Sequence, residues 1–165
     1  MVQTYDGDSK SNNEARWGSL KLDMSIYKSY SVQDTIDIAK KIAQTAIPGD
    51  IFLLNGDMGC GKTVFAKGFA LGLMIDSLVT SPTFTLLNVY HGYLDLYHFD
   101  LYRCQGQIEE LGFHEYFFGK GVCLIEWGCY AVDTLHRYNE INIKTDNTIG
   151  SDYRLIEAIT NTVSS

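Results

Sequence analysis

The residues best suited to chemistry form a glycine-rich octapeptide at positions 56–63, which reads GDMGCGKT. Its spacing is that of the phosphate-binding loop G-x-x-x-x-G-K-[ST], in which glycines let backbone N–H groups converge on an anion. Lys62 offers a mobile positive charge for the β- and γ-phosphates, and the Thr63 hydroxyl is placed to ligate Mg²⁺. The octapeptide follows a short apolar run and precedes a helical pattern, as this motif requires. The sequence therefore predicts a nucleotide-phosphate site.

Two acidic residues stand at the ends of predicted strands. Glu126 follows the apolar run 122–125, and Asp100 belongs to the string HFDLYR at residues 98–103. In an α/β sheet, the carboxyl end of a strand beside a phosphate-binding loop is where an acid holds the metal or orients water. We predict that Asp100 and Glu126 share metal ligation and water activation.

A short loop, Ser81-Pro82-Thr83-Phe84, lies between the predicted P-loop helix and the next strands. In a P-loop protein this is the position of switch I, where a hydroxyl senses the γ-phosphate and its metal. The alternative is an ordinary proline-containing turn.

Strands alternate with helices along the rest of the chain. A loose strand pattern occupies the 20s up to residue 30. The other predicted strands cover residues 51–54, 86–90, 93–99, 122–125, 140–144 and 153–159, and the predicted helical segments cover 31–46, 64–73, 107–118 and 129–136. This alternation predicts an α/β fold, and the hairpins make the sheet mixed. With the P-loop, we expect a three-layer P-loop NTPase-like sandwich with a mixed central sheet.

Composition narrows the function further. The 165 residues include 13 Lys+Arg and 20 Asp+Glu, which gives a net charge of −7. That balance argues against strong direct binding of nucleic acid by this chain alone. No apolar run is long enough to span a membrane, and we expect a cytoplasmic protein with reduced cysteines. Residues 1–18 are predicted to be a flexible N-terminal extension, and residues 19–165 a single P-loop ATPase domain.

These motifs together resemble the TsaE family, also called YjeE. The resemblance covers about residues 31–154 and rests on GDMGCGKT at 56–63, TSPTF at 80–84, HFDLYR at 98–103, ELG at 110–112 and IEW at 125–127. The family is a group of small bacterial ATPases needed for the threonylcarbamoyladenosine (t6A) modification of tRNA. The resemblance implies that the chain acts with the TsaB–TsaD heterodimer, in which TsaD performs the transfer while ATP hydrolysis resets it.

The same resemblance implies roles for particular residues. The phosphates of ATP would be held by the segment from Met58 to Thr63, that is Met58, Gly59, Cys60, Gly61, Lys62 and Thr63. Thr63 and Glu126 would bind Mg²⁺, Asp100 would assist the metal or the attacking water, and Val32 would lie near the adenine.

Five residues, in three parts of the chain, are ambiguous. Cys60 stands where the family usually has a small apolar residue, and we favour plain replacement of alanine over a thiol with a lowered pKa at a helix N-terminus. Trp127 is suited equally to the core, to the nucleotide and to a partner. Tyr116, Phe117 and Phe118 are a candidate partner surface or part of the core.

Other classes of P-loop protein remain open. A small-molecule kinase usually needs several arginines around the transferred phosphate, and this chain has four in all. A GTPase usually needs an Asn/Thr-Lys-x-Asp loop, and residues 143–146 read IKTD, with the wrong first residue. A nucleotide-gated binding module with negligible hydrolysis is the third alternative.

Overall fold

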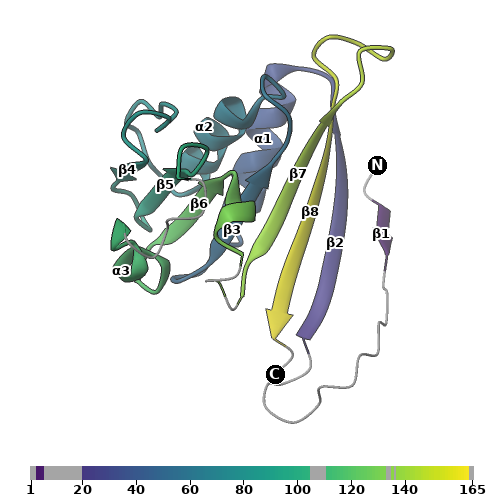
Figure 1. Cartoon of the computed structure of the whole chain (residues 1–165). Coiled ribbons are helices and arrows are strands. Elements are labelled where there is room, and N and C mark those ends of the chain that lie inside the picture. Colours follow the sequence, from purple (N-terminus) through teal and green to yellow (C-terminus); the bar gives the residue numbers. More distant parts are fainter. Residues whose placement is uncertain (1–2, 6–19, 105–110, 133–134, 136, 164–165) are drawn as a thin grey trace.

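One mixed β-sheet organises the part of the chain that the computed structural model describes, which is residues 3–5, 20–104, 111–132, 135 and 137–163 (Figure 1). The strand order is β1-β2-β8-β7-β3-β6-β5-β4. The strands are β1 (Gln3–Tyr5), β2 (Leu20–Ser29), β3 (Ile51–Asn55), β4 (Leu87–Tyr90), β5 (Leu96–Asp100), β6 (Val122–Glu126), β7 (Asn139–Thr145) and β8 (Arg154–Val163). The helices are α1 (Val32–Ala43), α2 (Lys62–Gly72), α3 (His114–Phe117) and the 3₁₀ turn η2 (Gly128–Tyr130). The predicted α/β class and mixed sheet are confirmed.

The direction of the strands divides the sheet into two parts. β3 pairs in parallel with β6 and β7, and β6 pairs in parallel with β5. β8 lies antiparallel between β7 and β2, and β4 closes the opposite edge as an antiparallel partner of β5. The carboxyl ends of β3, β5 and β6 therefore meet at one edge of the sheet, where the P-loop begins.

Helices α1 and α2 pack together on one face of the sheet (Figure 1). Ser31 caps α1, since its hydroxyl accepts a hydrogen bond from the backbone N–H of Asp34 at 3.1 Å. The two helices approach so closely that a Cβ atom at Gly68 would lie 2.4 Å from the carbonyl oxygen of Ile36. Gly68 thus lets α1 pack closely against α2. This packing holds α2, the helix that follows the P-loop, in place.

Two apolar clusters fill the two faces of the sheet. The first lies under α1 and α2 and includes Phe52, Phe65, Phe69 and Leu124. The second lies on the opposite face and includes Phe99, Phe117, Ile125 and Leu135. The covering of this second face is thin, because the helical elements described there are only α3 and η2.

Several elements differ from the sequence prediction. Residues 3–5, inside the predicted extension, form strand β1 beside β2, and the rest of the extension lies outside the described residues, so the boundary at residue 19 stays a prediction. Of the predicted helix 129–136, residues 129 and 130 belong to the 3₁₀ turn η2, and its other described residues, 131, 132 and 135, are in no helix. Tyr93 is not in a strand, because its backbone N–H donates to the Leu73 carbonyl at 2.8 Å and ties the hairpin turn to the end of α2. Among the described residues, no helix has both the length and the apolar character that crossing a membrane would need.

Candidate functional site

The P-loop joins the carboxyl end of β3 to the first turn of α2, as the sequence predicts. Gly59 has φ 79° and Gly61 has φ 109°, in the left-handed region that a residue with a Cβ rarely adopts. Gly61 is also the N-cap of α2, and no side chain caps this end. The free N–H groups and the helix dipole therefore stay available to an anion.

Lys62 is bound to the loop that it is predicted to serve. Its Nζ donates to the carbonyl oxygens of Gly56 at 2.9 Å and Asp57 at 3.1 Å, and it lies 5.2 Å from the ring centroid of Trp127. The side chain is buried, with 8% exposed. Lys62 thus brings one buried positive charge to the loop, held by two carbonyl dipoles and an aromatic face.

A second cation reaches the P-loop from β8, two strands away from β3 at the same edge of the sheet. The Nε of Arg154, the first residue of β8, donates to the carbonyl oxygen of Cys60, and its guanidinium also donates to the carbonyls of Ser151 and Tyr153 at 2.8 Å each. This contact holds the Cys60 peptide in one orientation. It was not foreseen from the sequence, because 94 residues separate the two partners.

Cys60 packs inside the loop. Only 2% of the residue is exposed, and its sulfur packs so closely on Gly56 that a Cβ at that position would lie 2.5 Å from it. Burial raises the pKa of the Cys60 thiol, and this outweighs the lowering effect of nearby Lys62. A reactive thiolate is therefore disfavoured, in agreement with the packing role that we favoured.

Asp100 and Glu126 lie side by side at the ends of two parallel strands. They are direct partners in the β5–β6 register, and Glu126 is also level with Leu54 of β3, just before the P-loop. Each is buried, with 4% exposed. The two carboxylates that the sequence selected thus meet at the edge where β3 enters the P-loop.

The loop at residues 81–84 touches Asp100 directly. The Thr83 hydroxyl donates to Asp100 Oδ2 at 2.9 Å and is 2.8 Å from the Ser81 hydroxyl. The backbone N–H of Tyr102 donates to the other oxygen, Oδ1, at 3.0 Å. A movement of Thr83 would therefore break or shift its hydrogen bond to Asp100. A switch loop needs a direct connection of this kind to the site.

Glu126 has a different partner. Its Oε1 lies 3.0 Å from Nε2 of His98, a histidine with no exposed surface on β5. The sequence analysis assigned no task to His98 and missed this contact. The signal was available in the alternation of β5, since His98 and Asp100 are two residues apart and share a face of the strand.

The position of Trp127 bears on the three roles considered for it, in the core, at the nucleotide or at a partner. It has φ 58°, an unusual left-handed conformation for a residue with a side chain, and it comes directly after Glu126. The next residue, Gly128, packs directly on β3, because a Cβ there would lie 2.6 Å from a Leu53 methyl carbon. The half-buried ring lies 5.0 Å from that of Tyr102 and beneath Lys62, so Trp127 lines the site.

The remaining predicted site residues lie around this centre. Thr63 is in the first turn of α2, and Met58 is at the tip of the loop with 79% exposed. Val32, the first residue of α1, is 53% exposed. Nearby Tyr30 has its ring 5.4 Å from that of Tyr153, the neighbour of Arg154, so this end of α1 is connected to the P-loop side.

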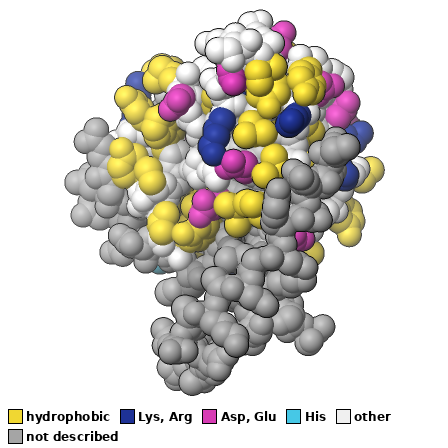
Figure 2. Space-filling view, turned by 90° about the vertical axis from the view of Figure 1, so that its right-hand side faces the viewer, with side chains coloured by type: hydrophobic (Ala, Val, Ile, Leu, Met, Phe, Trp, Pro, Cys, Tyr) yellow, Lys and Arg dark blue, Asp and Glu magenta, His cyan; other side chains and the backbone are white. Residues whose placement is uncertain are grey.

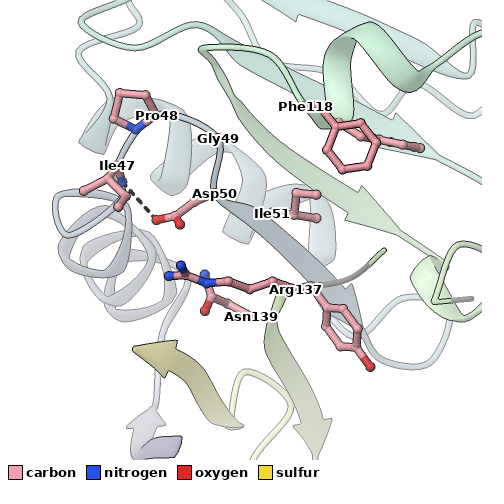
Figure 3. Close-up of a pocket in the computed structure, with 10 residues that line it drawn as sticks. Ile47, Pro48, Gly49, Asp50, Ile51, Phe118, Arg137 and Asn139 are labelled. Carbon is pink, nitrogen blue, oxygen red and sulfur yellow. Dashed lines mark hydrogen bonds between the residues drawn. The ribbon is translucent and has the colours of Figure 1, made fainter. Parts of the chain in front are cut away.

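Two hollows occur near β3, at its opposite ends. One of about 530 Å³ adjoins the P-loop and is lined by Asn55, Gly56 and Asp57 together with polar residues of β7 and β8. The other, of about 190 Å³, lies at the start of β3 between Asp50, Phe118 and Arg137 (Figure 3). Only the first hollow borders the predicted chemistry.

The donor set fits a hard cation with few protein ligands. No group of three or more His, Cys, Asp or Glu side chains forms a metal cluster among the described residues. Mg²⁺ typically takes one or two protein oxygens and completes its shell with phosphate and water. A hydroxyl at the start of α2 and a carboxylate at the end of β6 match that requirement.

Comparisons with known proteins agree on one family. Residues 29–155 match the family model described as Threonylcarbamoyl adenosine biosynthesis protein TsaE. The chain is 51% identical over 102 residues to the tRNA threonylcarbamoyladenosine biosynthesis protein TsaE of Bacillus subtilis, covering 61% of this chain and 65% of that protein. It is 45% identical over 112 residues to the protein of the same name from Treponema pallidum, covering 67% of this chain and 83% of that one.

A solved structure is also similar. The crystal structure of YdiB from Bacillus subtilis superposes with a TM-score of 0.72 at 39% identity, and the match covers 88% of each chain.

Proposed function

The chain belongs to the TsaE family of threonylcarbamoyl adenosine biosynthesis proteins, and from that premise we propose that it is a Mg²⁺-dependent ATPase serving the t6A modification of tRNA. The observation that carries the proposal is the junction of a phosphate-binding loop with two buried carboxylates at one edge of the sheet. We assign the domain to the three-layer P-loop NTPase-like sandwiches. The helical layer on the face opposite α1 and α2 is thin.

The chain's own groups have separate tasks in this proposal. The loop from Met58 to Thr63 holds the triphosphate through backbone N–H groups, and Lys62 exchanges its two loop carbonyls for phosphate oxygens. Val32 and its neighbours at the start of α1 lie toward the adenine.

Thr63 and Glu126 are the protein ligands for Mg²⁺ in the proposed site. When bound, the ion neutralises charge on the β- and γ-phosphates. Asp100 orients the attacking water through a carboxylate fixed by Thr83 and Tyr102. The catalytic set is therefore Lys62, Asp100 and Glu126.

Glu126→Ala tests this assignment. Isothermal titration calorimetry should still detect ATP binding, whereas Mg²⁺-dependent release of phosphate should fall by about a hundredfold or more. Glu140→Ala on β7 is the matched control and should hydrolyse ATP at the wild-type rate. Unchanged turnover in Glu126→Ala would remove this residue from the site, and transfer of phosphate to a small acceptor rather than water would favour the kinase alternative.

Partner dependence is the second part of the proposal. We propose that the chain acts with the TsaB–TsaD heterodimer and hydrolyses ATP slowly without it. A pull-down with TsaB–TsaD, with and without ATP, tests this step. Capture only in the presence of ATP would support a nucleotide-controlled complex, and no capture in either condition would contradict it.

The charge distribution supports leaving tRNA contact to the partner. Lys and Arg side chains are scattered among acidic and hydrophobic ones on the described part of the face in Figure 2. With a net charge of −7, the isolated chain should bind tRNA weakly in a filter-binding assay at moderate salt. Its location in the cytoplasm stays a prediction from the sequence.

A further inference from the structure

The contact between His98 and Glu126 assigns the histidine a task in the site. Nε2 of His98 lies 3.0 Å from Glu126 Oε1, and both side chains are almost completely buried. Among the described residues, His98 is the side-chain hydrogen-bond partner of Glu126, whereas Asp100 is held by both Thr83 and Tyr102. The orientation of the Glu126 carboxylate therefore depends on one imidazole.

The surroundings of the imidazole select its tautomer. Nδ1 of His98 is buried and has no hydrogen-bond partner within the described part of the chain. A hydrogen on Nδ1 would be an unpaired buried donor, and it would leave a bare Nε2 facing a carboxylate oxygen at hydrogen-bonding distance. A hydrogen on Nε2 donates to Glu126 instead and leaves Nδ1 as an unpaired acceptor, so the geometry favours the Nε2–H tautomer.

Such a bond fixes one oxygen of a carboxylate and leaves the other for a ligand. Partners of this kind behind a metal ligand orient it, and their loss typically weakens metal affinity by about 10–100-fold. We propose that His98 is a positioning residue that holds Oε1 of Glu126, so that the carboxylate is preorganised to bind Mg²⁺ with ATP. This inference rests on the proposed function, since it takes Glu126 as the ligand.

The tautomer can be measured on the unmodified protein. Selective ¹⁵N labelling of the four histidines, with a long-range ¹H–¹⁵N correlation spectrum near neutral pH, distinguishes a protonated ring nitrogen from a bare one. His98 should show the hydrogen on Nε2. A hydrogen on Nδ1 would overturn the inference.

Variants test the consequence for Mg²⁺. A glutamine amide can place a donor near the position of Nε2, whereas asparagine is too short and leucine has no donor. Calorimetry of ATP binding at a series of Mg²⁺ concentrations, referred to ATP binding by the same variant in EDTA, should show a midpoint raised by about tenfold in His98→Leu and His98→Asn. His98→Gln should restore most of the loss. His91→Leu, at an exposed histidine of the β4–β5 turn, is the matched control.

The outcomes separate the inference from the proposed function. If wild-type protein binds ATP with no dependence on Mg²⁺, the proposed function fails. If wild-type binding depends on Mg²⁺ but His98→Leu and His98→Asn keep its midpoint, only the role of His98 fails. Circular dichroism and thermal unfolding of each variant identify any that has lost its fold, and the His98→Asn and His98→Gln pair then decides, because both keep a polar side chain at the buried position.

Discussion

The parallel part of the sheet, centred on β3 and β6, and the antiparallel part, formed by β2 and β8, differ in how far their faces are exposed to solvent. In the parallel part, every residue of β6 and the first four of β3 are buried, so these strands are covered on both faces. In the antiparallel part, β8 alternates, with Ile156 and Ala158 buried and the residues next to them, Leu155, Glu157 and Ile159, partly exposed. This is the contrast expected between parallel strands under helices and antiparallel strands with one open face.

The same division separates two kinds of charged group. Lys62, Asp100 and Glu126 are buried beside the parallel strands, and each has specific hydrogen-bond partners. The ion pair between Lys144 and Glu157 joins β7 to β8 at 2.9 Å, with 60% of the lysine side chain exposed. A charge acts more strongly on a ligand where water is excluded, because the local dielectric constant is low. The charged groups suited to chemistry are therefore those buried beside the parallel strands.

The largest expected effect is on stability, and it compares one substitution in both parts. Ile125→Ala on β6 removes a completely buried side chain and should lower the free energy of unfolding by about 4 kcal/mol. Ile159→Ala on β8, where the side chain is partly exposed, should lower it by about 1 kcal/mol. Urea unfolding followed by circular dichroism measures both. Equal losses would mean that the open face is covered in solution, and the contrast would then disappear.

Local patterns predicted the parallel part well. The P-loop, its flanking strand and helix, and the acids at 100 and 126 are set by short-range spacing, and the pairing of β3 with β6 follows from where such an acid must sit. Helix α1 was also predicted, because Ser31 and the run of small apolar residues define its start and its buried face. The predicted end at residue 46 is three residues too late, because the chain leaves the helix before Pro48.

What the sequence did not reveal depends on contacts between distant segments. Arg154 reaches the Cys60 carbonyl only because β8 returns between β7 and β2, and no local pattern encodes that order. The strand predicted over residues 93–99 begins only at Leu96, and Tyr93 is 80% exposed, since its backbone is held by the end of α2. Of the three aromatics at 116–118, Phe117 is buried and Phe118 is exposed, because the four-residue helix α3 turns them to different sides.

A second comparison uses lysines. Lys62→Ala should weaken ATP binding by about a hundredfold, or about 3 kcal/mol, because a buried cation contacts the phosphates through charge-assisted hydrogen bonds. Lys144→Ala should change it by less than about threefold, since an exposed ion pair contributes little. Lys67→Ala, at an exposed position on α2, is the control for removing a positive charge close to the P-loop. Calorimetry with Mg²⁺ and ATP measures all three.

The lysine comparison also tests how far the bound nucleotide extends from the P-loop. Lys144 lines the hollow that adjoins the P-loop. A loss of affinity in Lys144→Ala as large as that in Lys62→Ala would show that the nucleotide extends across β7 and β8, and that the antiparallel part belongs to the binding site.

The smallest expected effect is the contribution of one buried thiol to the dependence of stability on alkaline pH. This thiol lies in the parallel part, whereas the antiparallel strands β2 and β8 contain no cysteine. Burial raises the pKa of the Cys123 thiol on β6 from 9.0 to about 12, and the thiol donates to the Tyr116 carbonyl at 3.3 Å. The folded state therefore keeps this proton at pH values where the unfolded chain releases it. Stability from this group is complete below the unfolded pKa and is lost as the pH rises toward the folded one, by about 1 kcal/mol between about pH 8 and pH 10.

Cys123→Ala isolates that contribution from the other groups that titrate in this range. The variant should be less stable than wild type at about pH 8, because it leaves a small cavity, but its free energy of unfolding should fall less steeply as the pH rises. Urea unfolding at several pH values gives both slopes. The remaining thiols and tyrosines are the same in the two proteins, so they cancel in the difference. If the free energy of unfolding fell equally steeply with pH in both proteins, the Cys123 thiol would be in contact with water. The parallel strands would then be no better shielded from solvent than the antiparallel ones.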